Sequence, residues 1–240
     1  MPAPYKTPPI IYEDNHLLLA AKPPGIPSQS GRTAVPDMLE LLKRDLEIRY
    51  RKPGKAYLGL VHRLDQPVSG LMVFAKTSKA ASRLSRAFRT RQVQKLYLAI
   101  VRGQPEGDQG SMRDILSRKE IGGRVRRQIS DQEGCEAVLN WRVLSRDQGR
   151  GEALLLIELI TGRRHQIRAQ MATHGLPLLG DRRYGLMDER DRIVPTIALH
   201  ACGLSFPHPV SGETMTFRLA PDINPSFSEE DALAFEAGCL

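Results

Sequence analysis

Short apolar segments with strand-like composition recur along this chain, and turn-forming proline, glycine, asparagine and aspartate residues separate them. Such segments are typical of β-strands that end in turns. They do not alternate regularly with helices, and the sequence has no repeat period. This pattern predicts an α+β fold with a largely antiparallel or mixed sheet, flanked by helices and loops. The strand candidates are residues 10–15, 16–25, 58–61, 70–75, 96–101, 137–144, 153–160, 196–204 and 214–219.

Three segments predict helices. The first follows Pro36 and Asp37, the second follows Ser78, and the third spans residues 164–173 before a stop at residues 174–175. Apolar residues recur at helical spacing in the first two, so each is expected to pack one side on the sheet. These positions are Leu39, Leu42 and Leu46 in the first helix, and Ala80, Leu84, Ala87 and Phe88 in the second.

The composition is that of a globular protein, with 41% hydrophobic and 26% charged residues among 240. Residues 10–220 are expected to form one domain, with an extended segment at residues 1–9 and an acidic tail at residues 221–240. The longest apolar stretches fall far short of the roughly 20 residues that a membrane span needs. The N-terminus does not resemble a secretory signal. Three scattered cysteines (Cys135, Cys202 and Cys239) predict a cytoplasmic protein without a disulfide framework.

Positive charge is unevenly distributed along the chain. The formal net charge is +8, although the last twenty residues hold five acidic residues and no lysine or arginine. Residues 76–102 contain eight basic residues and no acidic one. Such a run favours binding to a polyanion over a merely solvated helix face. A second basic stretch, residues 113–127, predicts a mobile loop or a hairpin.

Residues 61–70, with the sequence VHRLDQPVSG, place one carboxylate in a loop at the end of an apolar strand. Asp65 lies close to Arg63, and neighbouring cations favour an ionised carboxylate that can act as a nucleophile. From the residues alone, Asp65 could equally cap a turn.

Residues 158–185 contain a strand, a Thr-Gly turn and a predicted helix with two arginines. Because Arg164 and Arg168 are four residues apart, they are expected to share a helix face. Arg168 could meet a phosphate, pair with a buried carboxylate, or be an ordinary solvated arginine.

Together these motifs resemble those of the RluA-type pseudouridine synthase family, over most of residues 10–210. The resemblance implies the pseudouridine synthase catalytic fold for residues 10–220, and an isomerase that converts specific uridines in structured RNA to pseudouridine. The matching segments, in family order, are KPPG at 22–25, HRLD at 62–65 with SG at 69–70, KLYLAIVRG at 95–103, TGRRHQIR at 161–168, GLPLLGDRRYG at 175–185 and LHACGLSFPHP at 199–209.

The resemblance also implies roles for individual residues. Asp65 would be the catalytic aspartate, Tyr97 would contact the target base and assist proton transfer at C5, and Arg168 would be the ion-pair partner of Asp65. Arg63 would help to extrude the target nucleotide. The expected RNA-binding residues are Arg63, Lys76, Lys79, Arg83, Arg86, Arg163 and Arg164.

The implied reaction breaks the bond from N1 to C1′, rotates the uracil and joins C5 to C1′, and it needs no cofactor. Attack at C1′, elimination to a glycal and addition at C6 all employ the same aspartate, so the three routes stay open. Two departures from the family stand out. Val68 occupies a position that is most often threonine, and the residues before Ile10 leave no room for an S4-type domain, so a short family member is expected.

The alternative interpretation is a non-catalytic RNA-binding or RNA-folding factor on the same scaffold. The presence of Asp65, Arg63, Tyr97 and Arg168 favours the enzyme. A metal-dependent nuclease would need clustered carboxylates, and the histidines lack the paired spacing of metal ligands. The expected partner is therefore RNA, either ribosomal or transfer RNA, with no metal and no membrane, and the chain is expected to be a monomer.

Overall fold

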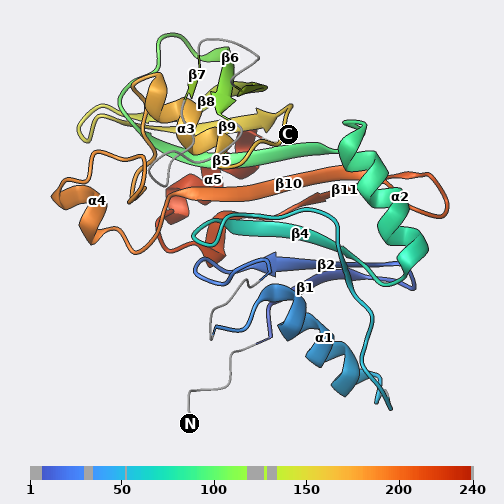
Figure 1. Cartoon of the computed structure of the whole chain (residues 1–240). Helices are drawn as coiled ribbons and strands as arrows, with labels where there is room; N and C mark the ends of the chain where they lie inside the picture. Colours follow the sequence, from blue (N-terminus) through green and yellow to red (C-terminus); the bar gives the residue numbers. More distant parts are fainter. Residues whose placement is uncertain (1–6, 30–34, 52, 118–126, 129–133, 239–240) are drawn as a thin grey trace. The chain divides into compact units, whose positions relative to one another are not determined.

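The computed structural model describes residues 7–29, 35–51, 53–117, 127–128 and 134–238. It divides into two compact units (Figure 1). Unit 1 comprises Met1–Val93 and Leu204–Leu219, and unit 2 comprises Gln94–Gly203 and Ala220–Leu240. The boundary therefore falls within strand β10 (Leu199–Pro207). Most of the expected N-terminal segment at residues 1–9 lies outside the described residues.

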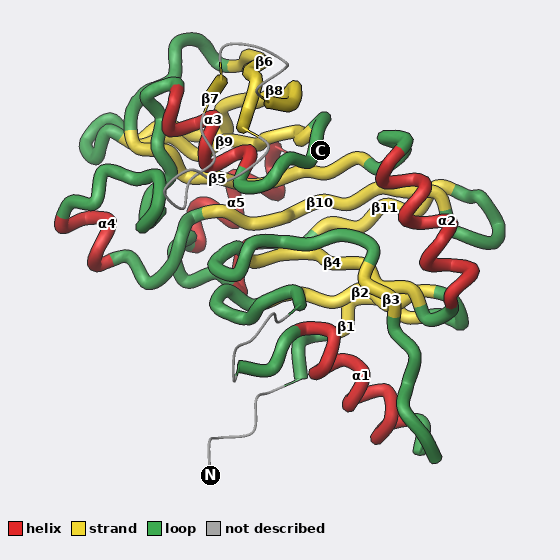
Figure 2. Tube along the Cα trace, in the orientation of Figure 1, coloured by secondary structure: helices red, strands yellow, loops and turns green. Residues whose placement is uncertain are grey.

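In unit 1, β2 is antiparallel to β1 on one side and to β4 on the other, while β3 also pairs with β4 and β11 pairs with β10 (Figure 2). All six residues of β2 are buried, as expected of an apolar run covered on both faces. The elements are β1 (Ile10–Glu13), β2 (Leu17–Lys22), α1 (Met38–Arg49), β3 (Gly59–Leu60), β4 (Ser69–Ala75), α2 (Ser78–Arg89) and β11 (Thr214–Arg218).

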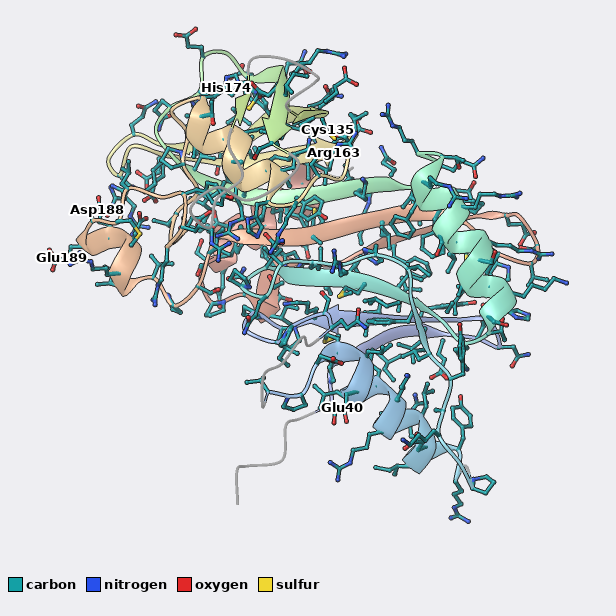
Figure 3. The ribbon with its side chains drawn as sticks, in the orientation of Figure 1. Glu40, Cys135, Arg163, His174, Asp188 and Glu189 are labelled. Atoms are coloured by element: carbon teal, nitrogen blue, oxygen red, sulfur yellow. The ribbon has the colours of Figure 1, made fainter. Side chains whose placement is uncertain are left out.

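The predicted helices of unit 1 are confirmed. Asp37 caps α1, because its side chain accepts a hydrogen bond from the backbone N–H of Glu40 at 2.8 Å (Glu40 is labelled in Figure 3). The apolar side of α2 packs on alternate residues of β2 and β4. The buried residues of this core are Leu17, Leu19, Leu71, Val73, Ala75, Ala80, Leu84, Ala87, Val93, Leu204 and Phe206.

In unit 2, the strands follow the order β5, β9, β8, β6 and β7, and each neighbouring pair is antiparallel. Helix α3 contacts β6 and β7, and α5 contacts β8. The elements are β5 (Gln94–Arg102), β6 (Gln109–Ser117), β7 (Arg127–Gln128), β8 (Gly134–Asp147), β9 (Glu152–Leu159), α3 (Gln166–Thr173), α4 (Glu189–Ile193), η1 (Pro221–Ile223) and α5 (Glu229–Gly238).

The basic stretch at residues 113–127 has structure that the sequence only partly indicated. β6 and β7 pair as the arms of a hairpin, with Ile115 opposite Gln128, and residues 118–126 lie outside the described residues. Strand β6 was not among the strand candidates. The alternation of apolar and polar residues that predicts a strand is obscured in β6, because the charged residue Asp114 occupies a buried position. No helix in the described part of the chain is long and apolar enough to cross a membrane.

The acidic C-terminal segment contributes to the core of unit 2. Phe235 of α5 is buried among side chains of β5 and β9, including Leu98, Ile100, Leu154 and Leu156. Three acidic residues of α5, Glu229, Glu230 and Glu236, are exposed. The helix therefore anchors the end of the chain through one aromatic ring.

Replacing this ring tests that anchor. We expect Phe235→Ala to lower the free energy of unfolding by about 3–5 kcal/mol, because it leaves a cavity in the core. Leu233→Ala in the same helix is the control, since Leu233 is 64% exposed and its loss should change stability by less than about 0.5 kcal/mol. Urea unfolding measures both, and equal changes for the two variants would contradict the described packing.

Candidate active site

Asp65 lies in the loop that leads into β4, within unit 1. The loop closes on itself, because the N–H of Val68 donates to the carbonyl of Asp65 at 3.0 Å. Ser28 fixes the preceding residue: its hydroxyl donates to the carbonyl of Leu64 at 2.7 Å and accepts from the N–H of Leu64 at 3.0 Å. The backbone on both sides of Asp65 is thus held in place.

The side chain of Lys22 also holds this loop, through hydrogen bonds to its backbone. The lysine side chain is fully buried, and Nζ donates to the carbonyls of Pro23 at 3.0 Å, Gln66 at 2.9 Å and Val68 at 2.6 Å. Three acceptors match the three N–H donors of an ammonium group. Burial lowers the pKa of Lys22 to about 7, while the negative charge of Asp65 acts to raise it. The lysine therefore joins the end of β2 to the part of the loop that directly follows Asp65.

His62 and Arg63, at the start of the HRLD motif, lie in different surroundings. His62 packs inward: its ring stacks on Phe88 with centroids 4.7 Å apart, and its Nε2 accepts from the N–H of Val73 at 3.0 Å. Arg63 is exposed. The histidine thus has a structural contact, and the arginine next to Leu64 faces solvent.

Tyr97 lies on β5 in unit 2 and is partly buried. In antiparallel strands, residues in register share a face of the sheet. That face also contains Ala137, which packs against Ala169 of α3. Tyr97 is thus on the side of the unit 2 sheet that α3 covers. The connection from Tyr97 to Ala137 crosses two strands. Tyr97 pairs with Ile157 of β9, and Leu159, two residues further along β9, pairs with Leu139 of β8, which lies two residues from Ala137.

Arg168 forms a buried, bidentate ion pair with Asp181 in unit 2. Its Nε is 2.8 Å from Oδ2 of Asp181, and its Nη2 is 2.7 Å from Oδ1. Asp181 is 0% exposed and also accepts the backbone N–H groups of Arg183 and Tyr184. Burial alone would raise the pKa of Asp181, but the hydrogen bonds and charge of Arg168 hold it below its usual value. Arg168 is therefore no ordinary solvated arginine.

Helix α3 begins two residues later than the sequence predicted. His165 has the left-handed backbone conformation (φ 52°) and precedes the first helical residue, Gln166. A residue with this backbone does not continue a right-handed helix. Arg164 consequently lies outside the helix and is exposed, so the expectation that it shares a helix face with Arg168 was wrong.

A buried chain of polar side chains fixes α3 to the sheet. The hydroxyl of Thr161 donates to Gln166 at 2.8 Å, and Gln166 donates to Gln170 at 2.9 Å. Gln170 in turn donates to Asp114 at 2.8 Å, and Asp114 contacts His174 at 3.0 Å (His174 is labelled in Figure 3). These contacts fix the rotation of the helix. Gln166 lies within the TGRRHQIR motif and Gln170 lies just after it, but helical spacing alone gave neither a role.

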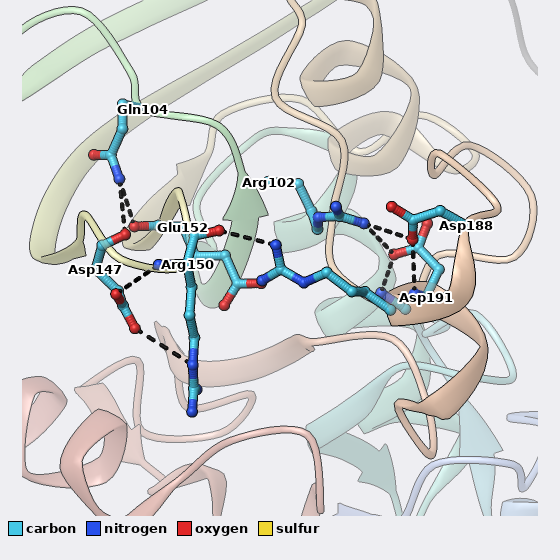
Figure 4. A network of polar contacts seen from close by, with 9 residues as sticks. Arg102, Gln104, Asp147, Arg150, Glu152, Asp188 and Asp191 are labelled. Carbon is cyan, nitrogen blue, oxygen red and sulfur yellow. Dashed lines mark hydrogen bonds and ion pairs between the residues drawn. The ribbon is translucent and has the colours of Figure 1, made fainter.

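A second network, which includes the contacts of Arg102 with Asp188 and Asp191 shown in Figure 4, holds the loop that carries Asp181. Asp191 is buried and accepts the N–H of Gly180 at 3.1 Å and the N–H of Met187 at 2.9 Å, which lie on either side of that loop. Arg102 at the end of β5 donates to Asp188 at 2.8 Å. The first turn of α4 thus closes the loop around Asp181.

The predicted RNA-binding residues are in different situations. Lys79, Arg83 and Arg86 are exposed on α2, and Arg83 also donates to the carbonyl of Pro209 at 2.5 Å. Lys76 already forms an ion pair within the protein, because its Nζ lies 2.6 Å from Oε1 of Glu13. That ion pair competes with any phosphate contact.

The two arginines before α3 are both exposed. Arg163, labelled in Figure 3, donates through Nε to the carbonyl of Glu136 at 2.9 Å. It therefore combines a backbone contact with an exposed guanidinium.

The histidines do not converge on one point in the described part of the chain. His165 contacts Tyr184, His174 contacts Asp114, and His208 contacts Asp14. Within the described ranges, no group of three or more His, Cys, Asp and Glu side chains could hold a metal ion.

Comparison with known proteins identifies similar sequences and folds. A family model described as RNA pseudouridylate synthase matches residues 16–173. The dual-specificity RNA pseudouridine synthase RluA of Haemophilus influenzae is 34% identical over 213 residues, which cover 89% of this chain and 93% of that protein. An uncharacterized RNA pseudouridine synthase of Aquifex aeolicus is 34% identical over 224 residues, covering 88% of this chain and 68% of that protein.

Two solved structures share the fold. Human RNA Pseudouridylate Synthase Domain Containing 4 has a TM-score of 0.75 at 22% identity and covers 95% of this chain and 92% of its own. Human RNA Pseudouridylate Synthase Domain Containing 1 has a TM-score of 0.72 at 23% identity and covers 100% of this chain and 98% of its own. The expected α+β fold, with a mixed sheet and flanking helices, is confirmed.

The buried position of Lys22 predicts a specific pH dependence. Between pH 7 and its ordinary value of 10.5, Lys22 is charged in the unfolded chain but largely neutral in the folded one. The unfolded state then binds more protons, so stability should rise with pH in this window, by up to about 1.4 kcal/mol per pH unit. Lys22→Met, which has a similar shape and no charge, should lack this rise. Urea unfolding of both proteins at pH 7.5 and 9.5 checks the difference, and parallel pH profiles would refute it.

Proposed function

Because the chain belongs to the RNA pseudouridylate synthase family, we propose that this RNA pseudouridine synthase isomerises specific uridines in structured RNA through Asp65. The family assignment confirms the resemblance found in the sequence motifs. The observation that carries the catalytic proposal is the anchoring of Asp65 by Ser28 and Lys22, which are both buried. A reactive carboxylate needs such a rigid support to keep a productive geometry.

In the proposed reaction, Asp65 provides the carboxylate that acts on the target nucleotide. The N1 to C1′ bond breaks, the uracil rotates, and C5 bonds to C1′. C5 then loses one proton and the freed N1 gains one, so the product is an isomer of the substrate. Because the reaction only rearranges bonds within the nucleotide, it consumes no cofactor. Direct attack at C1′, a glycal intermediate and addition at C6 use the same carboxylate, and the route is not part of the proposal.

Arg168 is proposed as the ion-pair partner that orients Asp65. A guanidinium has five N–H donors in a rigid plane, of which Asp181 takes one on Nε and one on Nη2. The plane of Arg168 is thereby fixed. Support for this role comes from the burial of the pair and from the two networks that hold α3 and the Asp181 loop.

Tyr97 is proposed to contact the target base and to assist proton transfer at C5. A phenol can stack on a uracil ring and exchange a proton with it. Its position on the α3 side of the unit 2 sheet supports this role, because Arg168 belongs to α3.

A base must leave its stack before its glycosidic bond can be reached, which costs a few kcal/mol. We propose that the exposed Arg63 helps to extrude the nucleotide, and that basic side chains hold the phosphates on either side. Lys79, Arg83 and Arg86 of α2 are suited to this, because they are exposed on one helix that has no acidic residue. Arg163 and Arg164 are proposed to add contacts before α3. For Lys76, a phosphate contact would have to replace the bond to Glu13.

The first test is the loss of the catalytic carboxylate. Purified Asp65→Ala should form no pseudouridine in ribosomal or transfer RNA that the wild type modifies, but should bind that RNA with unchanged affinity. Asp222→Ala, which removes an exposed carboxylate from unit 2, is the control and should retain turnover. Turnover by Asp65→Ala would exclude the proposed role. A wild type that binds RNA and converts no uridine would favour the non-catalytic RNA-binding factor.

A second test separates positioning from RNA binding. Asp181 is fully buried and cannot touch RNA, so Asp181→Asn should lower kcat by about tenfold or more, equal to about 1.4 kcal/mol, with KM unchanged. Thermal melting defines a temperature at which the variant is folded for the assay. A loss confined to KM would contradict the role of this ion pair in orienting Arg168.

A further inference from the structure

The C-terminal end of α1 and the loop that follows it present large side chains to solvent. This loop connects α1 to β3 in unit 1 (Figure 2). Tyr50 is 52% exposed, Tyr57 is 48% exposed, and Ile48 is exposed further. Arg51 and Lys55 are exposed between them. These five residues are called the α1-end surface.

Positive charge on this surface is not neutralised by its neighbours. Residues 48–58 contain four basic residues and no acidic one. The nearby carboxylates already have partners: Glu13 and Asp45 bind Arg49 at 2.8 and 2.6 Å, and Glu47 accepts the N–H of Ala56 at 2.8 Å. Within the part of the chain that the structure describes, the side chains of Arg51 and Lys55 have no hydrogen bond or ion pair. An anionic partner would therefore meet uncompensated cations.

The ring of Tyr50 is held in place before any partner arrives. Its hydroxyl donates to Glu13 at 3.0 Å, and the cationic groups of Arg49 and Lys76 each lie 5.3 Å from the ring centroid. Cations at this distance are attracted to the face of an aromatic ring. A pre-positioned ring loses little conformational entropy when a base stacks on it.

Tyr57 connects this surface to α2. A Cβ atom added to Gly59 would lie 3.0 Å from Cβ of Ala81 and 3.1 Å from the hydroxyl of Tyr57, so the three residues are close neighbours. Ala81 belongs to α2, the helix whose exposed side carries Lys79 and Arg83. The aromatic surface thus borders the basic helix already proposed to hold phosphates.

Single exposed apolar side chains are common and need no explanation. Here two tyrosines and an isoleucine alternate with unneutralised cations, which is the combination that binds single-stranded nucleic acid: bases stack on the rings and phosphates meet the cations. We propose that the α1-end surface binds unpaired nucleotides of the substrate RNA away from the target uridine. This inference rests on the proposed function, and it adds a binding site that includes no catalytic residue.

The experiment measures binding of unfractionated transfer RNA and of a fluorescent oligouridylate over a range of salt concentrations. Tyr57→Ala should weaken binding about fivefold or more, as expected for one lost base stack, whereas Tyr57→Phe should retain it. Arg51→Glu combined with Lys55→Glu should weaken binding and reduce the slope of log K against log salt by about two. This double variant changes exposed residues only, so it keeps the test valid if Tyr57→Ala does not fold.

The matched control is Arg150→Glu combined with Arg192→Glu, which reverses two exposed charges in unit 2. Equal affinities and salt slopes for the two double variants would overturn the proposal, as would a loss of binding to anionic lipid vesicles but not to RNA.

Uridine isomerisation by the wild type is assayed in parallel. If the wild type isomerises uridine while the α1-end variants bind RNA normally, this inference fails and the proposed function stands. If the wild type converts no uridine, the proposed function fails, and the binding data still decide whether the surface recognises RNA.

Discussion

The buried ion pair between Arg168 and Asp181 is the constraint on which unit 2 depends. A guanidinium without a partner is costly to bury, so the chain must bring a carboxylate to it and keep it there. Two separate networks hold the elements that carry the pair: Gln166 and Gln170 fix the helix that carries the arginine, and Asp191 closes the loop that carries the aspartate. A buried ion pair is weak evidence for stability, and under the proposed function the Arg168–Asp181 pair serves to keep the guanidinium in place. Its proposed second partner is the carboxylate of Asp65.

Unit 1 also buries a cation, which is the ammonium group of Lys22. Lys22 loses its hydration on burial and replaces it with hydrogen bonds to three backbone carbonyls, two of which belong to the loop directly after Asp65. The lysine can make these contacts only if the loop adopts the described backbone. In both units, therefore, a buried basic side chain fixes the local geometry of a proposed catalytic residue or its support. The exposed basic residues have another proposed role, because those on α2 and at the α1-end surface face solvent, where phosphates could reach them.

Much of the fold could be predicted from sequence motifs, and the residues proposed to react were chosen from the same motifs, because local spacing records strands, caps and loops directly. Asp37 was recognisable as the start of α1, and HRLD placed Asp65 in a loop after an apolar strand. The supporting residues were hidden for physical reasons. Asp181 is followed by two arginines, which is typical of an exposed turn, and only the fold shows that its carboxylate faces inward. Asp114 interrupts the apolar alternation of β6, and the left-handed backbone of His165 delays α3 by two residues. Such features depend on contacts between segments far apart in the sequence, and no local pattern reports them.

The central claim is that this chain isomerises particular uridines in structured RNA. The most direct measurement is pseudouridine mapping, by a chemistry that marks pseudouridine, of total ribosomal and transfer RNA from cells that have or lack the gene. Both RNA classes belong in the experiment, because relatives that share about a third of the sequence are named as dual-specificity enzymes. The account predicts that at least one site loses its pseudouridine on deletion and regains it when the wild-type gene is restored. An unchanged map, together with purified protein that converts no uridine in either RNA class, would contradict it.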